Sequence, residues 1–302
     1  MHYSKEPISI DRQIDLLISR GLEIKNKDKA KKYLSNISYY RLAGYWWSMQ
    51  SDKEKHIFKP NSTFKNVIKI YNFDAELRLL VFDVLEKIEI SLRTKLIYHL
   101  SNEFDPWWFQ DTTLFKDTQA LIKTLENVRE EVDRSKDVFI KEHKKKYKDD
   151  HRFPPSWKTL ELTSLGALSK LYGNLRNDLK IKDIIAQDYG AINHTFLPSW
   201  LQSFTQIRNL CAHHSRLWNK NLPGSVKLPP DPPNKWISKV PKQHEFKHLY
   251  VHLCLMKYML DIIYPKNKFG NRLKDLLSKF DNIDPKALGM KDDWNEEPLW
   301  KA

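Results

Sequence analysis

The sequence predicts an all-α protein, and three of its properties support that fold class. Hydrophobic residues make up 41% and aromatic residues 12% of the 302 residues, which is enough for a large buried core. Only eight glycines are present, and sustained alternation of Val, Ile and Thr with polar residues is rare, although sandwiches and barrels need both. Apolar residues instead recur three and four positions apart, which is the spacing of a helix face. We therefore expect a helical bundle.

Residues 1–60 are predicted to form a basic, aromatic-rich helical segment. Three short helices are expected in it, over residues 11–21 (capped by Asp11), 29–34 and 39–49. Tyrosines and tryptophans alternate with lysines and arginines here, and Tyr40 and Arg41 are candidate RNA contacts. If these rings are exposed they can stack bases, whereas if they are buried they only pack the helices.

The longest helix is predicted from Phe64 to about Glu103, with Ser62 or Thr63 as its cap and an interruption near residues 72–74. Its apolar stripe also passes close to a charged row that contains Glu89 and Arg93. Glu89 can pair with Arg93 one turn further on. Alternatively, a carboxylate on this helix can hold an arginine of another helix in place.

The middle of the chain alternates helical and charged stretches. Helices are expected over residues 112–134, from Pro154 to about Leu171, and before Tyr189-Gly190. Between the first two lies a charged insertion, residues 141–152, without apolar periodicity. Its Lys144, Lys145 and Lys146 form the densest positive spot in the sequence, which is either an RNA-binding track or a solvated loop.

A strongly amphipathic helix is predicted over residues 199–219. One side carries apolar residues that include Trp200, Phe204, Ile207, Cys211 and Trp218, while the other carries Gln202, Gln206, Asn209, His213 and Arg216. After it we expect a Pro-rich loop over residues 220–243, helices over 245–264 and 269–280, and an irregular tail. These segments divide the chain into residues 1–60, a helical domain over 61–265, and a C-terminal helix and tail over 266–302.

Within the amphipathic helix, Arg208-Asn209-Leu210-Cys211-Ala212-His213 resembles the Arg-Asn-x-x-x-His signature of HEPN-type ribonucleases. Residues 39–46, 71–78 and 86–93 resemble the Abi proteins of bacterial abortive-infection systems, closest to the AbiD/AbiF branch, over roughly residues 5–265. The resemblance implies a HEPN-like bundle with additional N-terminal helices. It also implies catalytic roles for Arg208, Asn209 and His213, and two copies of the motif facing one cleft in a homodimer.

The spacing of the motif raises one geometric difficulty. Arg208 lies about 140° from His213 on the helical wheel, at the edge of the apolar face, so its head must curl back. A carboxylate from the helix over 64–103 would be a natural anchor. Glu89, Arg93, His214 and Arg216 are therefore supporting candidates, and His214 is expected nearer the buried side.

Charge and composition limit the partners that can be expected. The net charge of +13 favours a polyanion, and RNA is the expected partner: host RNA, phage RNA or a dedicated small non-coding RNA. No run of 18 apolar residues and no signal-peptide pattern appears, so we expect a cytoplasmic protein without membrane attachment. Cys211 and Cys254 lie in apolar patterns, and no metal or cofactor motif is found, so no cofactor, metal or disulfide is expected.

The sequence leaves two functions open. One is a metal-independent endoribonuclease of a phage-defence system, in which the 2'-hydroxyl of the RNA attacks the adjacent phosphorus at a composite dimer site. The other is an RNA-binding scaffold that holds a dedicated structured non-coding RNA, with its nuclease activity silent or regulated.

Overall fold

The computed structural model describes residues 2, 6–224 and 226–301. Residues 1, 3–5, 225 and 302, which belong to the predicted N-terminal segment, Pro-rich loop and tail, lie outside this description. The described part forms twelve α-helices and one two-stranded hairpin, which confirms the all-α class. The helices are α1 (Ile10–Ser19), α2 (Lys27–Ile37), α3 (Tyr39–Trp46), α4 (Phe64–Glu103), α5 (Thr118–Arg134), α6 (Val138–Lys146), α7 (Ser156–Thr159), α8 (Leu165–Asn174), α9 (Lys180–Gln187), α10 (Leu197–Ala212), α11 (Leu249–Ile263) and α12 (Phe269–Lys279).

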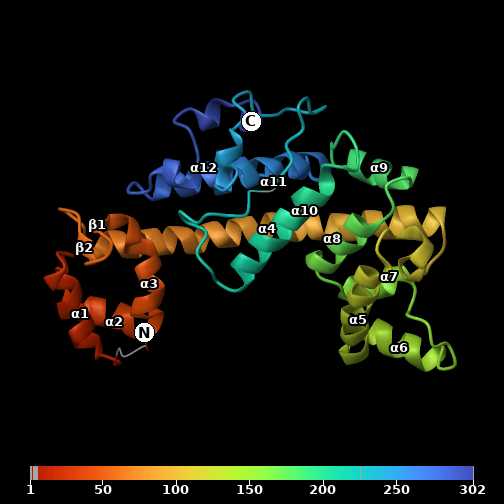
Figure 1. The fold of residues 1–302 in the computed structure, drawn as a ribbon, viewed down its shortest axis with the longest axis horizontal. Coiled ribbons are helices and arrows are strands. Elements are labelled where there is room, and N and C mark those ends of the chain that lie inside the picture. The colour runs from red at the N-terminus through yellow and green to blue at the C-terminus, as the bar shows by residue number, and fades with distance from the viewer. Residues whose placement is uncertain (1, 3–5, 225, 302) are drawn as a thin grey trace.

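Helix α4 is the axis of the fold and runs through the whole molecule in Figure 1. Thr63 begins it by accepting a hydrogen bond from the Asn66 amide, which satisfies one of the free N–H groups of the first turn. Helices α3, α8, α9, α10, α11 and α12 all contact α4. The N-terminal helices α1–α3 gather at one end of α4 and helices α5–α7 at the other.

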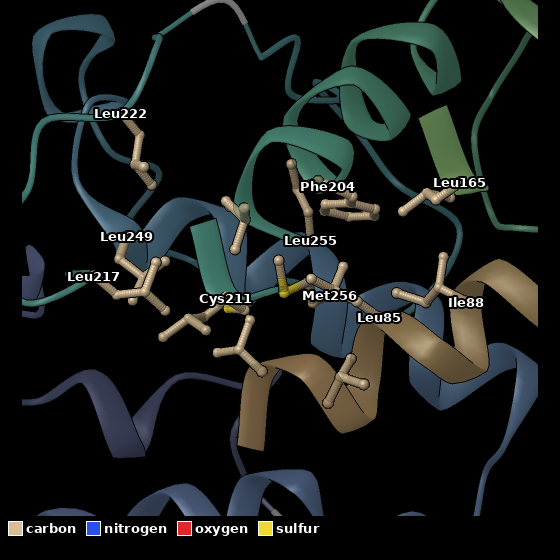
Figure 2. Packing of buried hydrophobic residues seen from close by; sticks show 14 of the residues in the cluster. Leu85, Ile88, Leu165, Phe204, Cys211, Leu217, Leu222, Leu249, Leu255 and Met256 are labelled. Atoms are coloured by element: carbon tan, nitrogen blue, oxygen red, sulfur yellow. The ribbon is translucent and has the colours of Figure 1, made fainter. Parts of the chain in front are cut away.

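The main core lies where α8, α10 and α11 meet α4. Figure 2 shows side chains from four helices converging there: Leu85 and Ile88 of α4, Leu165 of α8, Phe204 and Cys211 of α10, and Leu255 and Met256 of α11. These four helices therefore share one core. Burial raises the pKa of the Cys211 and Cys254 thiols to about 12, so both act as small apolar side chains.

Several predicted boundaries were wrong near the N-terminus. Helix α1 is capped by Ser9 rather than Asp11. Residues 50–58 form an antiparallel hairpin of β1 (Gln50–Asp52) and β2 (Ile57–Phe58), because Asp52 accepts hydrogen bonds from the amides of residues 54 and 55 and closes a turn. Helix α4 is continuous through residues 72–74, since the Asp74 carboxylate binds groups outside the helix backbone.

Two corrections concern the middle of the chain. The charged stretch is partly helical, because α6 buries Ile140 and the Lys144 ammonium donates to the Val132 carbonyl, 3.0 Å away. The helix predicted from Pro154 to Leu171 is split into α7 and α8. Carbonyls freed at this break, those of Leu160 and Thr163, accept hydrogen bonds from Arg93 of α4, which stabilises the interruption.

Among the described helices, none combines the length and the apolar character needed to cross a bilayer.

Helix α10 is fixed to α11 by a buried polar pair. His252 of α11 donates from Nε2 to the Phe246 carbonyl (3.0 Å), and its Nδ1 accepts from the Ser203 hydroxyl of α10 (2.6 Å). The bond that Nδ1 accepts requires a neutral ring, and burial lowers the pKa of His252 to about 4, although the bond to the Phe246 carbonyl acts in the opposite direction.

Because the pKa of His252 is lowered in the folded protein, we predict that acid destabilises the fold. The unfolded chain takes up a proton on His252 near pH 6.5 and the folded chain only near pH 4, so stability is full above 6.5 and falls as the pH drops through this window. The loss is on the order of 3 kcal/mol. We expect His252→Gln to be less stable than the parent at pH 7 but to lose less stability between pH 6.5 and 4. Urea unfolding across that range measures both, and parallel pH profiles would contradict the assignment.

Candidate active site

The C-terminal half of α10 presents the predicted motif. Its apolar side is buried through residues that include Trp200, Phe204 and Ile207, while Gln202 and Asn209 are exposed on the opposite side. The two faces predicted for this part of the helix are confirmed. The motif residues therefore stand on a rigid element that is held by α4, α8 and α11.

Arg208 curls toward α4, as its place at the edge of the apolar face requires. Its side chain is 31% exposed, and Nε lies 3.9 Å from Oε2 of Glu89. Nη1 also lies 3.5 Å from Oδ1 of the neighbouring Asn209, which accepts a weak hydrogen bond. The guanidinium is thus oriented by two oxygens while one side of it still faces solvent.

Glu89 serves both of the roles considered for it. Its Oε1 accepts a hydrogen bond from Nη2 of Arg93, 2.9 Å away, while Oε2 faces Arg208. Arg93 is buried and also donates to the carbonyls of Leu160 and Thr163. A cation fixed by three acceptors in turn fixes the carboxylate, so Glu89 offers Arg208 a rigid anion.

His213 lies at the end of α10. It is the residue after the last helical one, and its amide donates to the Asn209 carbonyl, 2.9 Å away. Its side chain is exposed, like that of Asn209 one turn earlier. The motif therefore places an amide and an imidazole on the same solvent-facing edge of the helix end.

The helix was predicted to continue to residue 219, and this is wrong. It ends at Ala212, and His214 has a left-handed backbone (φ 54°) and is exposed rather than turned toward the core. The physical reason is Asp74 of α4. Its carboxylate accepts hydrogen bonds from the amides of Leu217 (3.1 Å) and Trp218 (2.7 Å), two donors that a continuing helix would have used internally.

Asp74 also binds two side chains, and the three residues Tyr45, Asp74 and Arg78 form what we name the Asp74 cluster. The Tyr45 hydroxyl donates to Oδ2 at 2.8 Å, and Nη1 of Arg78 donates to the same oxygen at 2.5 Å. Burial raises the pKa of Asp74, and the Arg78 cation, the Tyr45 hydroxyl and the two amides oppose that rise. The cluster joins α3, α4 and the segment after α10.

Two arginines, one on helix α3 and one on the segment after α10, join these two parts of the chain. Nη1 of Arg41 donates to the His214 carbonyl, and Nη1 of Arg216 donates to the Gly44 carbonyl, each at 2.7 Å. Figure 1 shows the chain leaving the end of α10 in the direction of α3. Arg216 is therefore not part of a helical stripe with His213, but it belongs to the same turn.

Arg41 and Arg216 are site residues that the sequence predicts, whereas Tyr45, Gly44, Asp74 and Arg78 are not. The available signal was their place in two of the three stretches that carry the Abi resemblance, residues 39–46 and 71–78. What the sequence lacked was the pairing, because Asp74 and Trp218 are 144 residues apart.

The candidate RNA-binding residues fall in two places. Tyr40 on α3 is 91% exposed and stands beside Arg41, whereas Tyr45 and Trp46 of the same helix are buried. Lys144, Lys145 and Lys146 are exposed on α6, at the opposite end of the molecule from α3. RNA binding at either place stays a prediction.

Asn209 and His213 face solvent. Two hollows of about 530 and 690 Å³ flank α2, and neither is lined by Arg208, Asn209 or His213. Within residues 6–224 and 226–301, no three His, Cys, Asp or Glu side chains gather as a metal site would require.

A family model described as Abi-like protein matches residues 32–219, which is more than half of the 302 residues. The matched range contains α3, the Asp74 cluster, Glu89, Arg93 and the whole motif. It ends at the turn that Asp74 holds, before the Pro-rich loop and α11. No curated protein and no solved structure shows a significant match to the chain.

The Asp74 cluster predicts a strong effect on stability. Asp74→Asn leaves the Arg78 cation buried without its carboxylate, and such losses cost about 3 kcal/mol or more. A matched control is Asp281→Asn, which removes an exposed partner of Lys69 and should cost less than about 1 kcal/mol. Urea unfolding of both variants makes the comparison, and equal, small effects would show that the cluster does not hold the fold.

Proposed function

Because this chain belongs to the family of Abi-like proteins, we propose that it serves bacterial abortive infection as a metal-independent endoribonuclease. The observation that carries the proposal is the arrangement of Arg208, Asn209 and His213 at the exposed end of α10, with Glu89 behind the arginine. The same residues form the Arg-Asn-x-x-x-His pattern that resembles the signature of HEPN-type ribonucleases, and residues 39–46, 71–78 and 86–93 resemble the AbiD/AbiF branch of the Abi proteins.

RNA carries its own nucleophile, so the protein has to supply only three groups: a base, a cation and an acid. A base removes the 2'-hydroxyl proton while the 2'-oxygen attacks the adjacent phosphorus. A cation stabilises the charge on the phosphorane oxygens, and an acid gives a proton to the leaving 5'-oxygen. The bond from phosphorus to the 5'-oxygen breaks, and the products are a 2',3'-cyclic phosphate and a 5'-hydroxyl.

The residues of the motif match these tasks. An imidazole gains and loses protons near neutral pH, so His213 is assigned as base or acid. The planar fork of Arg208 is assigned to the phosphate oxygens, which it can bind through two parallel N–H donors. Glu89 contacts the Nε side of that fork and so leaves donors available to a phosphate. Asn209 is assigned to orienting the imidazole or a phosphate oxygen.

A second copy of the chain is part of the proposal, because one motif supplies one imidazole while the reaction uses a base and an acid. The face of α4 beside Glu89 offers it three exposed apolar side chains, with the exposed carboxylate of Glu86 among them. Leu79, Phe82 and Ile90 lie within about 80° of one another on the helical wheel and are all exposed, with 72% of Leu79 and 52% of Ile90 accessible. A two-fold axis near this surface would bring two motifs together.

The first test is removal of the imidazole. We expect His213→Ala to fold and to bind RNA like the parent but to cleave RNA at least about 100-fold more slowly, because the exposed ring contributes proton transfer rather than packing. His151→Ala removes another exposed histidine, after α6, and should retain full activity. Single-turnover cleavage of a labelled RNA measures all three proteins. Parent protein that binds RNA tightly and never cuts it would instead support the RNA-binding scaffold.

The second test is the assembly. We expect the parent protein to sediment as a dimer, and Ile90→Arg to sediment as a folded monomer with reduced cleavage, because a charge replaces an apolar contact on the proposed interface. Tyr98→Arg alters another exposed residue of α4, about 80° around the helix from Ile90, and should leave the mass unchanged. A parent protein that is active as a monomer would remove the second copy from the mechanism.

A further inference from the structure

The exposed face of α3 carries two aromatic rings on either side of an arginine. Tyr40, Gly44 and Trp47, which we name the α3 stripe, lie within about 60° of one another on the helical wheel. Trp47 directly follows α3 and keeps helical dihedral angles (φ −53°, ψ −40°). Tyr40 is 91% and Trp47 47% exposed. Arg216 lies across Gly44 between them, where a Cβ would stand 3.5 Å from Nε of the arginine.

Packing does not account for these two rings. The neighbouring Tyr45 and Trp46 bury all but 2% of their surfaces, and together with the fully buried Leu42 they are the residues by which α3 joins the core. Tyr40 points into solvent, and Trp47 is covered in part by Lys53 from the hairpin, whose Nζ lies 5.5 Å from the ring centre. Two rings left open on one stripe are available to a ligand.

The charges around the stripe are positive. Arg41 and Arg216 each donate one hydrogen bond to a backbone carbonyl, which leaves further N–H donors on both guanidinium groups and neutralises neither. The nearby Asp52 uses Oδ1 to accept from two amides of its own turn. Exposed rings that alternate with cations suit a strand whose bases stack while its phosphates bind the cations.

We propose that the α3 stripe binds single-stranded RNA beside the scissile bond, with unpaired bases stacked on Tyr40 and Trp47 and phosphates held by Arg41 and Arg216. The bond from Arg41 to the His214 carbonyl places this surface next to the residue that follows His213. Base-paired RNA keeps its bases inside the duplex, so the substrate class is RNA that is unpaired at the cut. This inference rests on the proposed function.

Binding to a catalytically silent protein tests the inference. Fluorescence anisotropy with an unstructured 20-nucleotide RNA is measured on His213→Ala protein that carries Tyr40→Ala, Trp47→Ala or neither. Each loss of a stacking ring should weaken binding about 10-fold or more. Tyr40→Phe keeps the stacking face and should bind within about twofold of the His213→Ala parent. A fully paired RNA of the same sequence should bind more weakly than the single strand and should not respond to Tyr40→Ala.

Tyr98→Ala, in the same background, removes an equally exposed tyrosine from α4 and is the matched control. The inference is overturned if Tyr40→Ala and Trp47→Ala bind the single strand like the His213→Ala parent, or if they change the sedimenting mass instead, because the stripe would then contact a second copy. Failure of the nuclease proposal has a different signature. In that case the intact protein does not cut RNA, while the loss of single-strand binding on removing either ring remains.

Discussion

The buried carboxylate of Asp74 is the constraint on which the site depends. It accepts hydrogen bonds from the hydroxyl of Tyr45 on α3, the guanidinium of Arg78 on α4 and the amides of Leu217 and Trp218 beyond α10. A charge removed from water is tolerated only when it is paired and hydrogen-bonded, so the three segments are held in one arrangement. His213 is at the end of its helix, rather than inside it, because of this cluster.

A second carboxylate, Glu89, controls the other half of the motif. Arg93 fixes it at 2.9 Å, while Arg208 stays 3.9 Å away and partly exposed. The ion pair thereby orients the arginine and leaves N–H donors of its guanidinium available, as binding to a phosphate requires. Both carboxylates lie on α4, so one long helix organises the cation of the motif and the turn that follows its histidine.

The apolar periodicity of the sequence was sufficient to predict the helices but not to predict where each of them ends. The apolar stripes predicted the helical class, the bounds of α4 and the two faces of α10, because burial dominates those choices. Prediction failed where a distant side chain captures backbone groups: Arg93 at the break between α7 and α8, and Asp74 after α10. Likewise, wheel geometry predicted a carboxylate behind Arg208, but no local pattern identifies Tyr45 and Asp74 as partners.

The central claim is that the RNA itself supplies the attacking oxygen, with His213 and Arg208 assisting. The most direct measurement is the chemistry of the new ends when purified protein cuts a defined RNA in the presence of a chelator. The account predicts a 2',3'-cyclic phosphate, or its hydrolysis product, together with a 5'-hydroxyl, and no cut at a position that carries 2'-deoxyribose. A 5'-phosphate end, a need for a divalent metal, or cleavage at the deoxy position would contradict it.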